Sequence, residues 1–336
     1  MRVRDIKIRD KVVGEEQPVF IVAEAGINHD GQVEQAKELV KRAKEAGADA
    51  VKFQTFRAES LCSKRDKNFE LFKSLELNRD EWESIAETAK NIGIIFFSSA
   101  FDEQSVELLD SLGVPVFKIA SGDLTYLPFL KYIARKNKPV ILSTGMSTLS
   151  EIDEALNVIY STGNHDVILL HCVSNYPTKV EDANLKAIKT LERVFGLPVG
   201  FSDHTIGTVI PIAAVSLGAK VIEKHFTLNK NLPGPDHKLS LTPDEFKDMV
   251  VNIRMVEQAL GDGLKVPRES EREARRWGRR SITAKINIPA GTTITQDMLQ
   301  IARPGIGLEP KFIDMVIGRT AKEDIQEGEA LTWDKI

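Results

Sequence analysis

Short apolar runs rich in β-branched residues alternate along this chain with longer segments of helical period. Each apolar run ends in polar residues, and most of the helical segments end near a glycine. The runs predict eight strands, over residues 19–25, 50–53, 94–98, 116–120, 140–143, 167–172, 199–202 and 221–226. Helices are predicted after them, over 32–46, 82–91, 103–112, 127–137, 150–160, 185–195, 209–217 and 244–260.

Eight strand-then-helix units in succession, with nearly continuous apolar strands, indicate a parallel sheet that is buried on both faces. Over a length of about 240 residues, eight such units favour a closed (β/α)₈ TIM barrel over an open sheet. No strand is followed directly by GxGxxG or GxxxxGK[ST], so neither a dinucleotide fold nor a P-loop is indicated.

The two ends of the chain differ from this repeat. Residues 1–16 alternate apolar and charged side chains like a pair of strands, which we expect to close the bottom of the barrel. We assign residues 1–264 to the barrel. Residues 265–280 form a charged linker or exposed helix, and residues 281–336 a small domain of short strands.

Composition limits the possible functions without naming one. The 336 residues carry 45 Lys+Arg and 49 Asp+Glu, a net charge of −4, so no overall field attracts nucleic acid or an anionic membrane. Cys62 and Cys172 lie far apart and form no CxxC pair, which argues for a reducing compartment. With no apolar signal core or membrane-spanning run, the expectation is a soluble cytoplasmic protein.

Polar side chains occur at the end of every predicted strand. In a barrel these ends converge on the face where active sites lie, so together they predict an enzyme pocket. The strand-end residues are Glu24, Lys52, Gln54, Ser98, Ser99, Lys118, Ser121, Asp123, Ser143, Thr144, His171, Ser174, Ser202, His204, Glu223 and His225.

Two of these residues, His204 and His225, occupy matched positions at the ends of the last two strands. Neutral imidazoles are common ligands of divalent metals, and two of them leave coordination positions open for substrate. The alternative is a pair of unrelated histidines at strand ends. The matched positions favour the metal.

The remaining pocket residues divide into two kinds. Lys118 and four hydroxyl residues suit a phosphate or carboxylate, because short donors surround a fixed positive charge; the four are Ser99, Ser121, Ser143 and Ser202. Any one of these serines could instead cap a helix. Glu24, Lys52 and Gln54 suit a hydroxylated substrate. Arg303, just before Pro304-Gly305, could be an ordinary surface arginine.

Several motifs in order resemble the sialic acid synthase family over nearly the whole chain. They are AEAGINHDG (23–31), VKFQT (51–55), FKIASGDLT (117–125), LSTGMS (142–147), CVSNYPT (172–178), GFSDHT (200–205), EKHFTL (223–228), GPDH (234–237), RRSI (279–282) and RPGIG (303–307). The resemblance implies a TIM barrel followed by an antifreeze-like (SAF) domain. It also implies a homodimer in which each SAF domain covers the partner's barrel.

The same resemblance implies condensation of phosphoenolpyruvate with an N-acetylated sugar aldehyde. N-acetylmannosamine is the favoured acceptor, giving N-acetylneuraminate and phosphate. Its 6-phosphate and the diacetamido-trideoxy precursors of legionaminic and pseudaminic acids remain open as alternatives. A lysine Schiff-base aldolase using Lys52 or Lys118, and a binding protein with the barrel as scaffold, rank below the synthase.

Residue roles carried over from the resemblance complete the expectation. His204 and His225 would bind Mn²⁺ or Mg²⁺, and Glu24, Lys118 and Asp123 would be catalytic. Asp123 stands where many bacterial members carry glutamate. The expected substrate-binding residues are Lys52, Gln54, Ser99, Ser121, Ser143, Ser174, Asn175, Tyr176, Ser202, Asp236 and Arg303, the last reaching into the partner's site. Whether Ser174 or Asn175 contacts phosphoenolpyruvate stays open.

Overall fold

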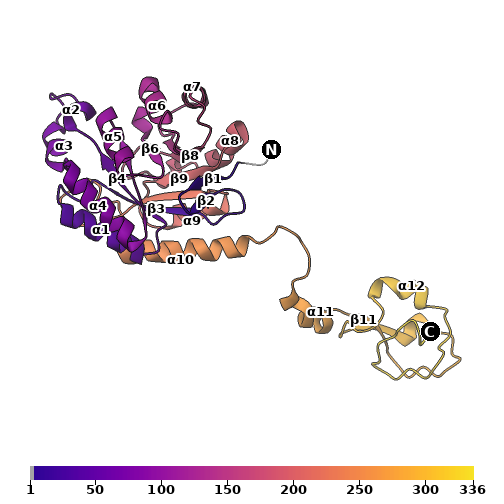
Figure 1. Cartoon of the computed structure of the whole chain (residues 1–336). Coiled ribbons are helices and arrows are strands. Elements are labelled where there is room, and N and C mark those ends of the chain that lie inside the picture. The colour runs from indigo at the N-terminus through magenta and orange to yellow at the C-terminus, as the bar shows by residue number, and fades with distance from the viewer. Residues whose placement is uncertain (1–3) are drawn as a thin grey trace. The chain divides into compact units, whose positions relative to one another are not determined.

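The computed structural model describes residues 4–336, and the first three residues of the predicted N-terminal strand pair lie outside this range. The chain forms two compact units that meet in sequence at Gly261 and Asp262 (Figure 1). The first is the barrel, and the second contains the small domain together with the charged segment before it.

The first unit is the predicted eight-stranded barrel. Its strands pair in parallel in the closed order β10-β3-β4-β5-β6-β7-β8-β9, and each lies within two residues of its predicted bounds. They are β3 (Phe20–Gly26), β4 (Ala50–Thr55), β5 (Ile95–Ala100), β6 (Phe117–Ile119), β7 (Val140–Ser143), β8 (Val167–Cys172), β9 (Val199–Asp203) and β10 (Val221–His225). Apolar strand residues are buried on both faces, as a parallel sheet covered by helices requires.

Helices follow the strands and cover the outside of the barrel (Figure 1). Local signals fix several of their ends: Asn78 and Thr148 form capping boxes, and Gly93 ends its helix at φ 71°. The helices are α1 (Val33–Glu45), α4 (Arg79–Ile92), α5 (Glu103–Ser111), α6 (Leu127–Ala134), α7 (Leu149–Tyr160), α8 (Lys186–Phe195), α9 (Val209–Ser216) and α10 (Pro243–Leu260).

The N-terminal hairpin of β1 (Ile6–Ile8) and β2 (Lys11–Val13) lies at the bottom of the barrel, as predicted. Its charged residues pair with carboxylates that directly precede strands. Lys11 Nζ lies 2.8 Å from Asp49 Oδ1 before β4, and a guanidinium nitrogen of Arg4 lies 3.0 Å from Asp166 Oδ1 before β8. The hairpin thus covers the amino ends of the strands and leaves their carboxyl ends uncovered.

Two short helices lie in the connection between β4 and α4, where the sequence pattern predicts none. They are α2 (Ala58–Leu61) and α3 (Phe69–Leu75). Phe56, Leu75 and Ile27 form a small apolar core there, and Phe72 and Phe101 pack against it. This packing holds α3 beside the open end of the barrel.

The second unit has its own core and a two-stranded antiparallel sheet of β11 (Ser281–Ala284) and β12 (Leu299–Ala302). The short helix α12 (Ile313–Val316) follows. The charged segment forms the exposed helix α11 (Arg272–Gly278), which the Gly305 amide joins to the small domain by donating to the Arg276 carbonyl at 2.8 Å. Within residues 4–336 no helix is long and apolar enough to cross a membrane.

Candidate active site

A cavity of about 540 Å³ opens at the carboxyl ends of the barrel strands. Most of the predicted site residues line it together, although they come from separate units of the repeat. These residues are Glu24, Lys52, Gln54, Ser99, Lys118, Ser121, Ser143, Ser174, Tyr176, Ser202, His204, His225 and Asp236. Alternation along β9 and β10 explains part of this convergence, because the first and third residues of Ser202-Asp203-His204 and Glu223-Lys224-His225 face inward.

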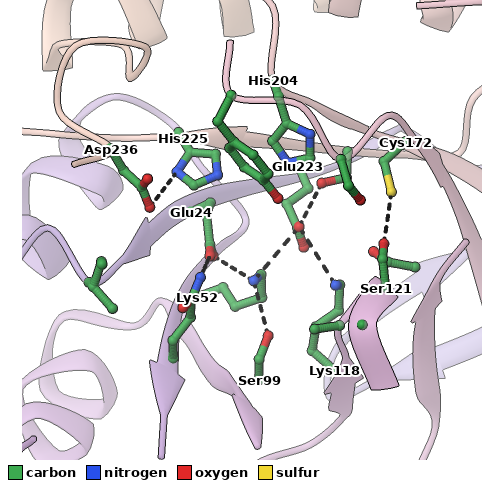
Figure 2. A pocket seen from close by; sticks show the side chains of 18 of the residues that line it. Glu24, Lys52, Ser99, Lys118, Ser121, Cys172, His204, Glu223, His225 and Asp236 are labelled. Atoms are coloured by element: carbon green, nitrogen blue, oxygen red, sulfur yellow. Dashed lines mark hydrogen bonds and ion pairs between the residues drawn. The ribbon is translucent and has the colours of Figure 1, made fainter. Parts of the chain in front are cut away.

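A buried cluster of charges forms the floor of the cavity (Figure 2). Lys52 Nζ lies 2.7 Å from Glu24 Oε2 and 3.7 Å from Glu223 Oε1. Lys118 Nζ lies 3.8 Å from the same Glu223 oxygen, to which Ser202 Oγ also donates at 2.9 Å. Glu223 is thus the counter-charge shared by two lysines, which makes the burial of both lysines tolerable.

Burial and ion pairing shift the pKa values of these four groups in different directions. Burial raises the pKa of Glu24 to about 7, although Lys52 opposes the shift. Burial also raises the pKa of Glu223, but Lys118 and Lys52 outweigh it and leave that pKa below its usual value. The pKa of Lys118 falls because burial outweighs Glu223. The pKa of Lys52 rises because Glu223 and Glu24 together outweigh burial.

The predicted anion-binding residues gather beside Lys118. Ser121 Oγ accepts from the Gly145 amide at 3.0 Å and lies 3.2 Å from Cys172 Sγ, so the turn after β7 fixes its position. Ser99 Oγ accepts from Lys52 at 3.3 Å. Short hydroxyl donors thus surround two ammonium groups, an arrangement that suits a phosphate or carboxylate.

His204 and His225 lie side by side, with ring centroids 5.4 Å apart. His204 Nδ1 lies 2.8 Å from the Val173 carbonyl, which can only accept, so this nitrogen carries the proton and Nε2 keeps its lone pair. His225 Nδ1 is buried without a hydrogen-bond partner. Burial lowers the pKa of both rings, which keeps them neutral near pH 7.

Two buried, neutral imidazoles with available lone pairs are a donor set suited to a divalent cation. Within residues 4–336 no group of three or more His, Cys, Asp or Glu residues is arranged to hold a metal. An ion here would therefore have two protein ligands, and its other positions would be open to water or substrate.

Tyr176 and Asp236 flank the two histidines. The Tyr176 ring packs on His204 at a centroid distance of 4.2 Å and meets His225 edge-on at 5.9 Å. Asp236 Oδ2 lies 3.8 Å from His225 Nδ1, and burial raises the pKa of this carboxyl. Gln54 Nε2 donates to Glu24 Oε1 at 3.3 Å, which extends the polar wall toward the β3–β4 side.

Three predicted residues do not line the cavity. Asp123 lies one residue beyond the lining residue Gly122, on a 3-10 turn, and its Oδ2 is buried without a partner. Burial raises the pKa of Asp123 to about 6. Asn175 is exposed, and Ser174 lines the cavity in its place. Arg303 is exposed on the second unit, directly after β12.

Several residues of the cavity wall have no role that the sequence predicts. Glu223 is among them, and its period-two spacing from His225 at the end of the same strand is the signal that indicates its place. An apolar part of the wall comes from Ile27, Leu71, Phe72, Phe101 and Met146, with Asn68 beside it. The helical spacing of Leu71 and Leu75 in FELFKSL could have indicated α3.

Three more of the polar strand-end residues, Ser98, Thr144 and His171, do not line the cavity. Ser98 Oγ pairs with Thr55 Oγ1, and Thr144 Oγ1 donates to the Leu170 carbonyl. His171 donates through Nε2 to the Ala183 carbonyl at 2.9 Å, on the outer side of β8. Its ring therefore holds a surface connection in place, and it does not belong to the site.

Comparison with known proteins agrees with this architecture. The NeuB family matches residues 39–265, and the SAF domain matches residues 279–336. The chain belongs to the NeuB family and carries a C-terminal SAF domain.

Relatives cover nearly the full length of the chain. An uncharacterised protein of Methanocaldococcus jannaschii is 52% identical, with 98% of each chain aligned. The N,N'-diacetyllegionaminic acid synthase of Legionella pneumophila is 45% identical, with 96% of each aligned. The crystal structure of an N-acetylneuraminic acid synthetase from Leptospira borgpetersenii is 36% identical, with a TM-score of 0.78 over 81% of this chain and 95% of that one. The second and third of these proteins are named as a synthase and a synthetase.

Proposed function

We propose that this protein condenses phosphoenolpyruvate with the open-chain aldehyde of an N-acetylated amino sugar. The products are a nine-carbon 2-keto-3-deoxy acid and phosphate, and one water is consumed. The observation that carries the proposal is a single cavity in which a lysine–serine group adjoins two neutral imidazoles. The legionaminic and N-acetylneuraminic acid synthases among the relatives support it.

Phosphoenolpyruvate would occupy the side of the cavity that Lys118 and the serines form. Two buried ammonium groups and short hydroxyl donors match its phosphate and carboxylate. Of the two neighbouring candidates after β8, Ser174 is the one we assign to this ligand, because it lines the cavity.

The acceptor sugar would lie on the side of Glu24, Gln54, Tyr176 and Asp236. These groups offer a carboxamide, a phenol and carboxylates to the hydroxyl and amide groups of an open-chain sugar. Lys52, paired with Glu24, stands between the two substrates and holds the carboxylate in place.

The donor set of His204 and His225 fits Mn²⁺ or Mg²⁺, and we assign the metal to these two residues. When bound there, the ion would act as a Lewis acid on the aldehyde oxygen. The proton on His204 Nδ1, held by the Val173 carbonyl, fixes the tautomer that exposes Nε2 to the ligand.

Each chemical step then has a protein group assigned to it. C3 of phosphoenolpyruvate bonds to the aldehyde carbon, and positive charge develops at C2. The protonated form of Glu24, populated near neutral pH because burial raises its pKa to about 7, supplies the proton that the former aldehyde oxygen takes up. Water adds at C2 and would give a proton to Asp123, which follows the lining residue Gly122 and carries a buried Oδ2 without a hydrogen-bond partner. The C2–O bond to phosphate then breaks, and Lys118 with the serines stabilises the departing anion.

We assign the active form to a homodimer. In it the exposed Arg303 of each small domain would reach the acceptor in the partner's barrel. An exposed arginine before a proline-glycine pair is suited to contact a ligand outside its own domain.

For the acceptor, the apolar part of the wall favours a diacetamido-trideoxy sugar over N-acetylmannosamine. Leu71 and Phe72 would contact a methyl group in place of a hydroxymethyl group, and burying apolar surface there is favourable. The 45% identity to the legionaminic acid synthase supports the same choice.

A Schiff-base aldolase is the second candidate, and the lowered pKa of Lys118 favours it. Such an enzyme would need neither the histidine pair nor phosphate release. Treating the protein with pyruvate and borohydride would trap a covalent adduct only in that case.

The deciding experiment is phosphate release from phosphoenolpyruvate with Mn²⁺, across N-acetylmannosamine, its 6-phosphate and diacetamido-trideoxy sugars, with and without chelator. Release that needs both the metal and one sugar supports the proposal and identifies the acceptor. If folded, Mn²⁺-treated protein releases no phosphate with any sugar, the proposed reaction is wrong.

A further inference from the structure

A fully buried histidine, His237, lies beside the cavity without lining it, and the proposed reaction gives it no role. Its Nε2 is 3.1 Å from both carboxylate oxygens of Asp30, and its Nδ1 is 2.6 Å from Thr227 Oγ1. Since a carboxylate only accepts, the Nε2 proton points to Asp30. In the neutral ring Nδ1 then accepts from the Thr227 hydroxyl.

This histidine connects two loops of the barrel that are distant in sequence. Asp30 belongs to the turn between β3 and α1, and His237 to the long connection between β10 and α10. Asn28 Nδ2 strengthens the connection by donating to Ser240 Oγ at 3.0 Å, and Ser240 Oγ in turn donates to the Asp236 carbonyl at 2.6 Å. The backbone that directly follows the Asp236 side chain is therefore held at two points, the Asp236 carbonyl and His237.

Gly234 shows how closely the two loops approach. A Cβ at this position would lie 2.6 Å from Asp30 Oδ1 and 2.9 Å from His237 Nε2. Both distances are far below van der Waals contact, so any side chain at residue 234 would push the loop away from the Asp30–His237 pair. Glycine is required here for close approach.

We propose that His237 is a positioning residue, which holds the Asp236 carboxylate at the acceptor side of the cavity by anchoring its loop to Asp30. The inference rests on the proposed function, because it assigns Asp236 to the acceptor sugar. Asp236 is the adjacent residue and lines the cavity 3.8 Å from His225. The connection between β10 and α10 is long, and without such an anchor the Asp236 carboxylate would occupy many positions.

The test compares two substitutions of the histidine. Asparagine at 237 reproduces the Nδ1 contact to Thr227 and loses Asp30, whereas glutamine places an amide where Nε2 donates to Asp30. We expect His237→Asn to raise the KM for the acceptor about tenfold and to leave the KM for phosphoenolpyruvate within about twofold. His237→Gln should recover part of the acceptor KM. Gly234→Ala should behave like His237→Asn.

A matched control separates positioning from loss of stability. Asn164→Ala also removes a buried side chain that holds two connections together, because Asn164 donates to the Ala134 and Lys138 carbonyls, but neither connection carries a cavity residue. It should leave both KM values unchanged. Equal changes in both KM values, or an unchanged acceptor KM in His237→Asn and Gly234→Ala, would overturn the inference.

Hydrogen exchange makes the test independent of turnover. Amides of residues 229–241 should exchange faster in His237→Asn than in wild type, while the strands exchange as before. If wild-type protein releases no phosphate with any acceptor, the proposed function fails, and the exchange data decide the anchoring alone. Unchanged exchange at 229–241 would then reject it.

Discussion

Asp203 and Lys224 form an ion pair of 2.6 Å, and neither side chain is exposed to solvent. Lys224 also donates to the Thr205 carbonyl, and the Thr205 amide and hydroxyl donate to Asp203. The pair lies on the outer face of β9 and β10, directly behind His204 and His225. It therefore fixes the two strand ends whose inner faces carry the proposed metal ligands.

Removing one charge of the Asp203–Lys224 pair should destabilise the fold. Lys224→Met would leave a buried, unpaired carboxylate, and we expect it to lower the free energy of unfolding by about 3–5 kcal/mol. The double variant Asp203→Asn, Lys224→Met should recover much of the loss, because both charges are gone. Urea denaturation measures both values.

Lys41→Met provides the surface control, since Lys41 pairs with Glu38 at 3.7 Å in an exposed position. That substitution should cost less than about 1 kcal/mol. If Lys224→Met were as mild as Lys41→Met, the pair would not hold the strand ends.

The histidine pair could be predicted from sequence because its signal is local. Ser202-Asp203-His204 and Glu223-Lys224-His225 each end an apolar strand, so strand alternation and barrel closure alone bring the two rings together. Lys118 reaches the cavity in the same way. Asp123 is different, because it lies on a 3-10 turn after β6, one residue beyond the lining residue Gly122.

Other features of the site depend on contacts that no local pattern encodes. Glu223 is the counter-charge of two lysines from two different strands, and only the closed barrel shows that all three meet. Leu71 and Phe72 reach the cavity because Phe72 packs on the small core formed by Phe56, Leu75 and Ile27. The anchor between Asp30 and His237 spans 207 residues of sequence.

His29 should make the protein sensitive to acid. Burial lowers its pKa from 6.5 to about 4 in the folded state. Between pH 6.5 and 4 the unfolded chain therefore binds a proton at this histidine that the folded chain does not bind. The free energy of unfolding falls as the pH drops through this range, by about 3 kcal/mol at most. Urea unfolding at several pH values between 7 and 4 measures this loss.

His29→Asn removes the titrating ring, and its amide oxygen can still accept from the Gly31 amide, as His29 Nδ1 does. The variant should show a flatter stability profile below pH 6.5. His165→Asn, at an exposed histidine, should keep the wild-type profile. A wild-type slope in His29→Asn would show that another group causes the acid sensitivity.

Asp123 should produce the acidic limb of the activity profile. Its pKa is raised to about 6 by burial, so the carboxylate that accepts the proton of water is lost below that pH. Phosphate release, measured as kcat, should fall as the pH drops through about 6. Asp123→Asn should lower kcat about 100-fold at pH 7.5 and remove the limb. If Asp123→Asn kept the limb at wild-type rate, proton transfer would belong to another group.

Loss of both proposed metal ligands should remove metal binding without unfolding the barrel. The double variant His204→Ala, His225→Ala should show no tight Mn²⁺ site in an electron paramagnetic resonance titration, and its circular dichroism spectrum should match wild type. Turnover should fall to background, because no Lewis acid reaches the aldehyde. Full metal-dependent activity in this variant would refute the assignment.

The apolar wall of Leu71 and Phe72 should determine acceptor choice. With wild-type protein, kcat/KM should be at least about tenfold higher for a diacetamido-trideoxy sugar than for N-acetylmannosamine, since one buried methyl group contributes about 1–3 kcal/mol of discrimination. Leu71→Asn should reduce this ratio, because its polar side chain solvates the hydroxymethyl group and no longer packs on the methyl. The reduction should appear in acceptor kinetics alone, with the KM for phosphoenolpyruvate unchanged.

Val251→Ser tests whether the effect is local, since Val251 is an exposed apolar residue of α10 outside the cavity. That variant should keep the wild-type preference. A wild-type enzyme that prefers N-acetylmannosamine would contradict the role of the wall even if the condensation itself is confirmed. If Leu71→Asn keeps the wild-type preference, the apolar wall does not determine acceptor choice. Contacts of the polar residues Gln54 and Asp236 with the acetamido groups would then distinguish the sugars.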